Sequence, residues 1–338
     1  MNMADINAFK IFFCLSLIKH SQKNYYLCVM KKEEKYPKNF QEFLLQFPDE
    51  RSCWLYLIDI RWSEGFCPYC QSGNYWLTSK HKIHCSDCEK EFSITGGTIF
   101  QDTKKSPLLW FHVMWRVVAQ KTGASANNLK DFMGFGSDGT AWNWLHKLRR
   151  AMIRQGREKL SGVVEVDEAY IGGDETGTGK QGSGAEKKIL AVVATECIEK
   201  KTGRVRFQII PDASAGNLLP FVEDNIEHDS DVITDGRSGY KFLSSNDNYK
   251  HEVKVIAGSG KGADELLPHV HLVISLVKRR IYGTHQGKVS PKYLEYCLDE
   301  FAFRFNRKMS KHRGKLFYRL MQQAVTTPPL LNKNIKNT

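Results

Sequence analysis

Apolar residues recur at three- and four-residue spacing through residues 107–156, which is the pattern of amphipathic helices. Glycine-rich breaks divide this stretch into three predicted helices, with the sequences PLLWFHVMWRVVAQ, ASANNLKDFMG and GTAWNWLHKLRRAMIRQ. A helix, a short helix, a turn and a third helix with a basic end are typical of a helix-turn-helix. Any small helical bundle would give the same pattern. A shorter amphipathic helix is predicted within residues 38–62.

From residue 161 the pattern changes to β-rich runs separated by glycine-rich or charged turns. Three strands are predicted first, in VVEVDEAYIG, KKILAVVATECI and RVRFQIIPDA, followed by a helix in SAGNLLPFVEDNIEHDS, a strand in DVITDG and a further strand in HEVKVIAGS. Two amphipathic helices follow, over residues 269–281 and in SPKYLEYCLDEFAFRFNRKM. The order β-β-β-α-β predicts a ribonuclease-H-like sheet in which the first and fourth strands are neighbours.

Four of the nine cysteines are regularly spaced, as two CxxC pairs with fourteen residues between them: Cys67, Cys70, Cys85 and Cys88. Four thiolates on paired turns make a closed tetrahedral site, which suits a structural Zn²⁺ ion. Iron is the minor alternative. The odd total of cysteines favours a reducing compartment over a disulfide framework.

The net charge of +12 is concentrated in two segments. Residues 104–160 contain eleven Lys and Arg against three Asp and Glu, and residues 278–320 contain twelve against three. Two basic segments favour a nucleic-acid partner, with a solvated basic surface as the alternative. The candidate DNA contacts are Lys147, Arg149, Arg150, Arg279 and Arg280. Since no apolar run reaches the roughly 18 residues of a membrane-spanning helix, no membrane partner is expected.

Two aspartates stand at strand positions where a carboxylate is costly unless it is paired or binds a metal ion. Asp167 lies within the apolar run VVEVDEAYIG, and Asp235 ends DVITDG. If their strands are neighbours, the two carboxylates can share catalytic Mg²⁺ or Mn²⁺ ions. Each aspartate capping a turn is the alternative. The segment GGDETGTGKQGSG does not have the spacing of a phosphate-binding loop, so we expect a flexible connection there.

The chain resembles insertion-sequence transposases of the fifteen-ninety-five family, the ISXO-like transposases, over about residues 37–320. The resemblance rests on motifs in the same order: FCPYC…HCSDC, FSITGGTIFQDTKKSPLLWF, GTAWNWLHKLR, VEVDEAYIGG, ITDGRSGY, LVKRRIYGTHQGKVSPKYL and LDEFAFRFNR. It implies a zinc ribbon, a DNA-binding helical region and an Asp-Asp-Glu-type catalytic core, with Asp167 and Asp235 as the first two acids.

The resemblance also implies a third catalytic residue, often Glu and sometimes Asn or His, with a Lys seven positions later. His271 lies 36 positions after Asp235, and Lys278 lies seven after His271. The two residues would share a helix face. Glu300, in LDEFAFRFNR, is the rival third acid.

The expected fold is therefore α+β and multidomain: an N-terminal extension poorly ordered over 1–36, a short helix with a zinc ribbon over 37–100, a helical DNA-binding region over 101–160, a ribonuclease-H-like catalytic domain over 161–325 and a disordered tail over 326–338. Met30 is an alternative start.

The expected function is a DNA transposase that cleaves and joins strands with Mg²⁺ or Mn²⁺. Its partners would be double-stranded DNA, as terminal inverted repeats and target, and further copies of the chain, on the nucleoid in a prokaryotic cytoplasm. The alternatives are a DNA-binding regulator or catalytically decayed copy and, more weakly, a structure-specific nuclease.

Overall fold

The computed structural model separates residues 1–35 from a second unit, residues 36–338. It describes residues 34, 36–62, 67–120, 123–154, 156–172, 188–255, 260, 262–285 and 289–330. The predicted extension, apart from residues 34 and 36, lies outside the described residues, as does the predicted flexible connection after Gly172. No helix among the described residues is both long and apolar enough to cross a membrane.

The predicted helix within residues 38–62 is two helices, α2 (Phe40–Gln46) and α3 (Glu50–Arg61). The break follows from local chemistry at Asp49. Its side chain accepts a hydrogen bond from the Ser52 backbone at 2.8 Å, and the Ser52 hydroxyl lies 3.5 Å from the Asp49 backbone nitrogen. This reciprocal capping arrangement begins a new helix at residue 50.

A small antiparallel sheet carries the cysteines. Its strands lie in the order β1 (Tyr75–Leu77), β2 (Lys82–Cys85) and β3 (Glu91–Ser93). Cys67 and Cys70 precede β1, whereas Cys85 ends β2 and Cys88 lies in the turn before β3. The two CxxC pairs are thus brought together by one hairpin and the segment before it.

The three helices predicted within residues 107–156 are present as α4 (Pro107–Ala119), α5 (Ala126–Met133) and α6 (Asp138–Ala151). Serine side chains cap all three N-termini: Ser106, Ser125 and Ser137. A further helix, α12 (Arg313–Ala324), was not predicted. It packs on α3, α4 and α6, so the last part of the chain completes the helical core.

The larger sheet has the order β6-β5-β4-β7-β8. The strands are β4 (Val163–Ile171), β5 (Ile189–Ile198), β6 (Lys201–Ile209), β7 (Asp231–Asp235) and β8 (Lys250–Lys254). β5 pairs antiparallel with both β4 and β6, and β7 and β8 run parallel to β4. The predicted pairing of the first and fourth of these strands is confirmed, because β4 pairs with β7.

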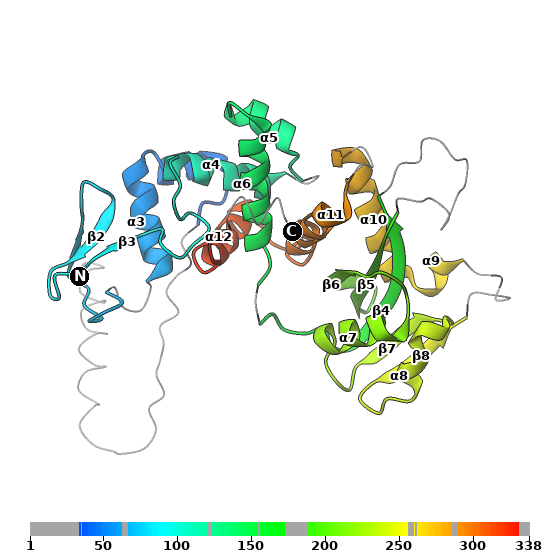
Figure 1. The fold of residues 1–338 in the computed structure, drawn as a ribbon. Coiled ribbons are helices and arrows are strands. Elements are labelled where there is room, and N and C mark those ends of the chain that lie inside the picture. Colours follow the sequence, from blue (N-terminus) through cyan, green and yellow to red (C-terminus); the bar gives the residue numbers. More distant parts are fainter. Residues whose placement is uncertain are drawn as a thin grey trace, which may run out of the picture. The chain divides into compact units, whose positions relative to one another are not determined.

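Helices cover both faces of this sheet. On one face lie α10 (Pro268–His285) and α11 (Pro291–Phe305), whose apolar residues pack with Ala169 and Ile171 of β4. On the other face α7 (Ala215–Asn225) packs with Val164 and Val166. Figure 1 shows α10 beside β4 and β5. Alternate β4 residues therefore face opposite layers.

Short helical segments make the remaining connections. A 3₁₀ turn, η1 (Ser238–Tyr240), and α8 (Lys241–Ser244) link β7 to β8, and α9 (Ala263–Leu266) precedes α10. The amphipathic helix predicted over residues 269–281 lies within α10, and its residues Val273, Val277 and Ile281 are buried.

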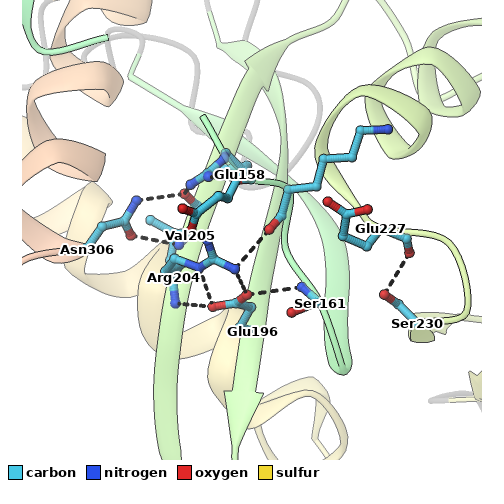
Figure 2. Close-up of polar contacts among 10 residues, drawn as sticks. Glu158, Ser161, Glu196, Arg204, Val205, Glu227, Ser230 and Asn306 are labelled. Carbon is cyan, nitrogen blue, oxygen red and sulfur yellow. Dashed lines mark hydrogen bonds and ion pairs between the residues drawn. The ribbon is translucent and has the colours of Figure 1, made fainter. Parts of the chain in front are cut away.

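A polar network ties the start of the sheet to α11 (Figure 2). Arg204 Nε donates to Glu196 at 2.9 Å, and the Ser161 backbone donates to the same carboxylate at 3.0 Å. The Asn306 side chain accepts from and donates to the Val205 backbone at 2.8 and 3.2 Å. These contacts hold the segment entering β4, the edge strand β6 and the end of α11 together.

Candidate functional site

Asp167 and Asp235 lie on neighbouring strands and on the same face of the sheet. The parallel register pairs Glu165 with Ile233, so continuing it by two residues sets Asp167 opposite Asp235. Ile233 packs in the cluster formed with α10, and so does Ala169, two residues after Asp167. Because side chains alternate along a strand, both carboxylates face the α10 layer.

Burial sets the protonation of Asp167. Burial, together with the negative charge of Asp235, raises the pKa of this carboxyl to about 6, against lowering contributions from the neighbouring backbone, Arg237 and Lys278. Two carboxyl groups that share a site disfavour each other's ionisation. The pair therefore gains from a cation placed between them.

The helix α10 brings His271 to this pair. His271 Nε2 lies 3.3 Å from Asp167 Oδ2. This buried nitrogen has no hydrogen-bond partner. Burial lowers the pKa of His271, which favours the neutral ring. Lys278 is exposed, two helical turns further along α10, and its charge acts on both Asp167 and His271.

Three residues that we did not single out in the sequence complete the surroundings. Arg237 forms ion pairs of 3.1 Å with both Asp235 and Glu168. Tyr240 donates a hydrogen bond to Glu168, the β4 residue that faces the α7 layer. Burial raises the pKa of Glu168 to about 7. Their position inside VEVDEAYIGG and ITDGRSGY was the available signal, but sequence does not show which charges pair.

The structure does not bring Glu300 to the aspartates. Its fully buried carboxylate lies among three arginines, at 2.8 Å from Arg149 Nε, 2.6 Å from Arg280 Nη2 and 2.9 Å from Arg304 Nη2. Burial alone would raise the pKa of Glu300, but the three guanidinium groups hold it far below its ordinary value. Arg304 also donates to backbone carbonyls at the end of α4, including Val118 at 3.4 Å. Glu300 thus joins helices and is a weaker candidate than His271.

The same network corrects two of the predicted DNA contacts. Arg149 is 2% exposed and the Arg280 side chain 7%, and both are engaged with Glu300. Arg150 and Arg279 are exposed, and Lys147 is half-buried. The clustering of Lys and Arg in the sequence did not show which of these side chains are buried and which are exposed.

Basic residues, some exposed and others partly or fully buried, line two hollows. One of about 860 Å³ lies between the end of α6 and α12, and its basic residues are Arg150, Arg154, Arg307 and Arg319. Another of about 770 Å³ lies among α5, α10 and α11, and its basic residues include Arg279, Arg280, Arg304, Lys308 and Arg313. Guanidinium and ammonium groups gathered in this way suit phosphate oxygens.

The four regularly spaced cysteines have the arrangement of a zinc site. Their sulfurs all lie within 4.8 Å of one another, with 3.5 Å between Cys67 and Cys88 and 3.5 Å between Cys70 and Cys85. Tetrahedral Zn–S bonds of about 2.3 Å place sulfurs about 3.8 Å apart. The residue after each pair, Gln71 or Glu89, has a positive φ of 62° or 56°, so both turns have the same form. The cluster can bind zinc.

Comparisons with known proteins found a family model, a relative and a solved structure to which this chain is similar. Residues 159–306 match the family model described as the ISXO2-like transposase domain. A protein of Halobacterium salinarum, described as an uncharacterised protein in transposable element ISH50, is 24% identical over 289 residues, which are 80% of this chain and 94% of that protein.

A chain of the simian T-cell lymphotropic virus intasome, solved in complex with PP2A regulatory subunit B56 gamma, aligns with 52% of this chain and 67% of its own length. The identity is 12% and the TM-score 0.28, a similarity too low to bear on the fold. The family match covers the segment from just before β4 to just after α11, which contains Asp167, Asp235 and His271. Residues 159–306 are therefore similar to the domain of ISXO2-like transposases, and the comparisons support an insertion-sequence transposase.

Proposed function

We propose that the chain is an insertion-sequence DNA transposase whose catalytic residues are Asp167, Asp235 and His271, assisted by Lys278. The observation that carries the proposal is the pairing of β4 with β7, which sets the two aspartates side by side under α10. The strand order, with three antiparallel strands followed by two parallel ones, supports a ribonuclease-H-like core.

The residues present fit a divalent cation. Two adjacent carboxylates and a buried imidazole nitrogen without a hydrogen-bond partner offer oxygen and nitrogen ligands that ion binding would satisfy. Carboxylates suit Mg²⁺ and Mn²⁺, and an imidazole suits Mn²⁺ better. A bound cation would supply positive charge to the attacking and leaving oxygens of an in-line displacement at phosphorus.

The chain's own residues position the reactants. Arg237 holds Asp235, and His271 is held on α10 against Asp167. Exposed Lys278 would hold the DNA backbone beside them. In the first step a water oxygen would bond to phosphorus while the bond to the 3′ oxygen breaks, which leaves a 3′ hydroxyl at the element end. In the second step that hydroxyl would attack target DNA in the same way.

The DNA would be bound outside the catalytic centre. Arg150 and Arg279, in two basic hollows, are the candidate phosphate contacts, with Lys147 at a half-buried position. The helices α5 and α6 pack on each other and are the proposed helix-turn-helix for the terminal repeats. Two element ends must be held together, so we propose a homo-oligomer on DNA, in the cytoplasm of a prokaryotic cell.

The test is a strand-cleavage and strand-transfer assay with labelled DNA that carries the repeats flanking the coding region. A transposase cuts at the repeat boundary and joins that end to a second DNA. A decayed copy or regulator, which the histidine in place of a third carboxylate favours, binds the repeats and yields neither product. A structure-specific nuclease cuts without requiring the repeats.

The third residue is tested in the same assay. His271→Ala should lose most cleavage. His271→Glu should cleave better in Mg²⁺, relative to Mn²⁺, than the wild type does, because a carboxylate replaces the softer ligand. If His271→Ala cleaves like the wild type while folded Glu300→Gln is inactive, the third catalytic residue is Glu300.

A further inference from the structure

A second group of metal-ligating side chains lies near the catalytic centre. Glu165, Cys197 and His269 each place a ligand atom within 4.8 Å of the others. Among the described residues, the only other group of three or more with this property is the four-cysteine cluster. The carboxylate is buried, and the thiol and imidazole are half-buried.

The fold brings these residues together from three elements. Cys197 of β5 pairs with Val163 of β4, and Glu165 lies two residues further along β4 on the same face. The β5–β6 ladder is irregular between Thr195 and Cys197. His269 belongs to the first turn of α10, which covers this face. The sequence gives no signal for the group, because its members are 32 and 72 positions apart.

All three side chains already have hydrogen-bond partners, and the Cys197 thiol donates to the Thr195 carbonyl at 3.7 Å. The Val270 backbone donates to Glu165 Oε2 at 2.8 Å, and the Thr202 hydroxyl lies 3.0 Å from His269 Nδ1. A metal-binding histidine is usually oriented by a hydrogen bond at its other ring nitrogen. In the tautomer whose Nδ1 donates to Thr202, Nε2 carries a free lone pair.

We infer that Glu165, Cys197 and His269 bind one Zn²⁺ ion. Sulfur, nitrogen and oxygen ligands together suit zinc and do not suit Mg²⁺, which takes oxygen ligands. Binding replaces the thiol proton of Cys197 by the metal, with no change of oxidation state. Three protein ligands leave a fourth position for water.

The ion would fasten the first turn of α10 to β4 and β5. His269 lies two residues before His271, and Glu165 lies two residues before Asp167. Zinc at this point would therefore fix the distance between α10 and the strand that carries Asp167. Any effect of this fixed distance on DNA cleavage rests on the proposed function, whereas the binding of zinc does not.

The test counts metal ions in the full-length protein. Wild type, Cys197→Ser and His269→Ala are equilibrated with micromolar Zn²⁺ in excess Mg²⁺, separated from free metal and analysed for zinc per chain. The wild type should contain one zinc more than either variant, whatever the four-cysteine cluster holds. Asp167→Asn and the exposed His228→Ala should contain as much zinc as the wild type.

Co²⁺ replacement provides a second readout that does not depend on how well the variants fold. Wild-type protein with its four-cysteine cluster already filled by Zn²⁺ should bind one Co²⁺ with a single-thiolate charge-transfer band. Equal zinc in wild type and both variants, or a wild type that binds no Co²⁺ through a thiolate, would overturn the inference. A wild type that gains the ion but cleaves no DNA refutes the proposed function and leaves the zinc site standing.

Discussion

Neighbouring carboxylates in this chain have different roles because alternate residues meet different layers. Asp167 faces α10 and His271, whereas Glu168 faces Tyr240 and Arg237. On α11, Glu300 is surrounded by three arginines, whereas the preceding residue, Asp299, has a carboxylate oxygen with no hydrogen-bond partner. The sequence predicted the candidate acids, but the direction of each side chain depends on strand register and helix phase.

The buried arginine cluster predicts a large cost for neutralising Glu300. Glu300→Gln leaves Arg149, Arg280 and Arg304 buried without their counter-ion, which should lower the free energy of unfolding by about 3–5 kcal/mol. Glu295→Gln, on the exposed side of the same helix, should cost less than about 0.5 kcal/mol. Urea denaturation measures both. If both variants lose a similarly small amount of stability, the arginine cluster contributes little to the free energy of unfolding.

Asp299 predicts that the free energy of unfolding depends on pH. Burial, with Glu295 nearby, raises its pKa to about 7, against Arg157 and Arg150. The folded state therefore binds the proton more tightly than the unfolded state, and its stability falls as pH rises from 5 to 8. Asp299→Asn removes this titration.

Between pH 5 and pH 8, the free energy of unfolding of Asp299→Asn should rise by about 1–3 kcal/mol relative to that of the wild type. Denaturation curves of both proteins at the two pH values give the difference. A variant whose stability relative to the wild type is the same at both pH values would rule out a raised pKa at Asp299.

At the scale of elements, periodicity predicted the helices of residues 107–156 and the strands of the larger sheet, because each has a long, regular pattern. It did not separate α2 from α3, where three residues, Phe47–Asp49, end one helix and cap the next. It also missed α12, whose apolar residues Leu316, Phe317 and Leu320 complete the core formed by α3, α4 and α6. Such pairing between distant segments is not visible in a local pattern.

The small sheet predicts that zinc binding and folding are coupled in residues 67–93. Cys70→Ser removes one of four thiolates, so the protein should lose this zinc ion and the fold of the module. Cys53→Ser, at a buried cysteine of α3 outside the cluster, should keep it. Metal analysis and proteolysis of the two proteins give the comparison, and unchanged zinc in Cys70→Ser would contradict a four-cysteine site.

At the scale of the whole molecule, the positive charge has two uses. Some arginines, such as Arg149, are buried and join helices, whereas others, such as Arg150, line open hollows. Net charge and its clustering predicted a nucleic-acid partner but could not divide the residues between these uses. The division depends on how α6, α10 and α11 pack.

Adjacent arginines on α6 provide a matched test. Arg150→Ala should weaken DNA binding and reduce the slope of log affinity against log salt by about 1, because one phosphate contact is lost. Arg149→Ala should instead lower the free energy of unfolding. Binding titrations at several salt concentrations, with denaturation as the second readout, separate the two. A folded Arg149→Ala protein with the greater loss of affinity would reverse the assignment.

The central claim is that Asp167 and Asp235 form one catalytic centre, and the most direct measurement is the single-turnover rate of cleavage at the element end. Asp235→Asn and Asp167→Asn should each slow cleavage by a factor of about a thousand or more while DNA affinity stays nearly unchanged. Asp231→Asn, at the exposed start of the same strand β7, should cleave at the wild-type rate. Cleavage by Asp235→Asn at the wild-type rate would contradict the account.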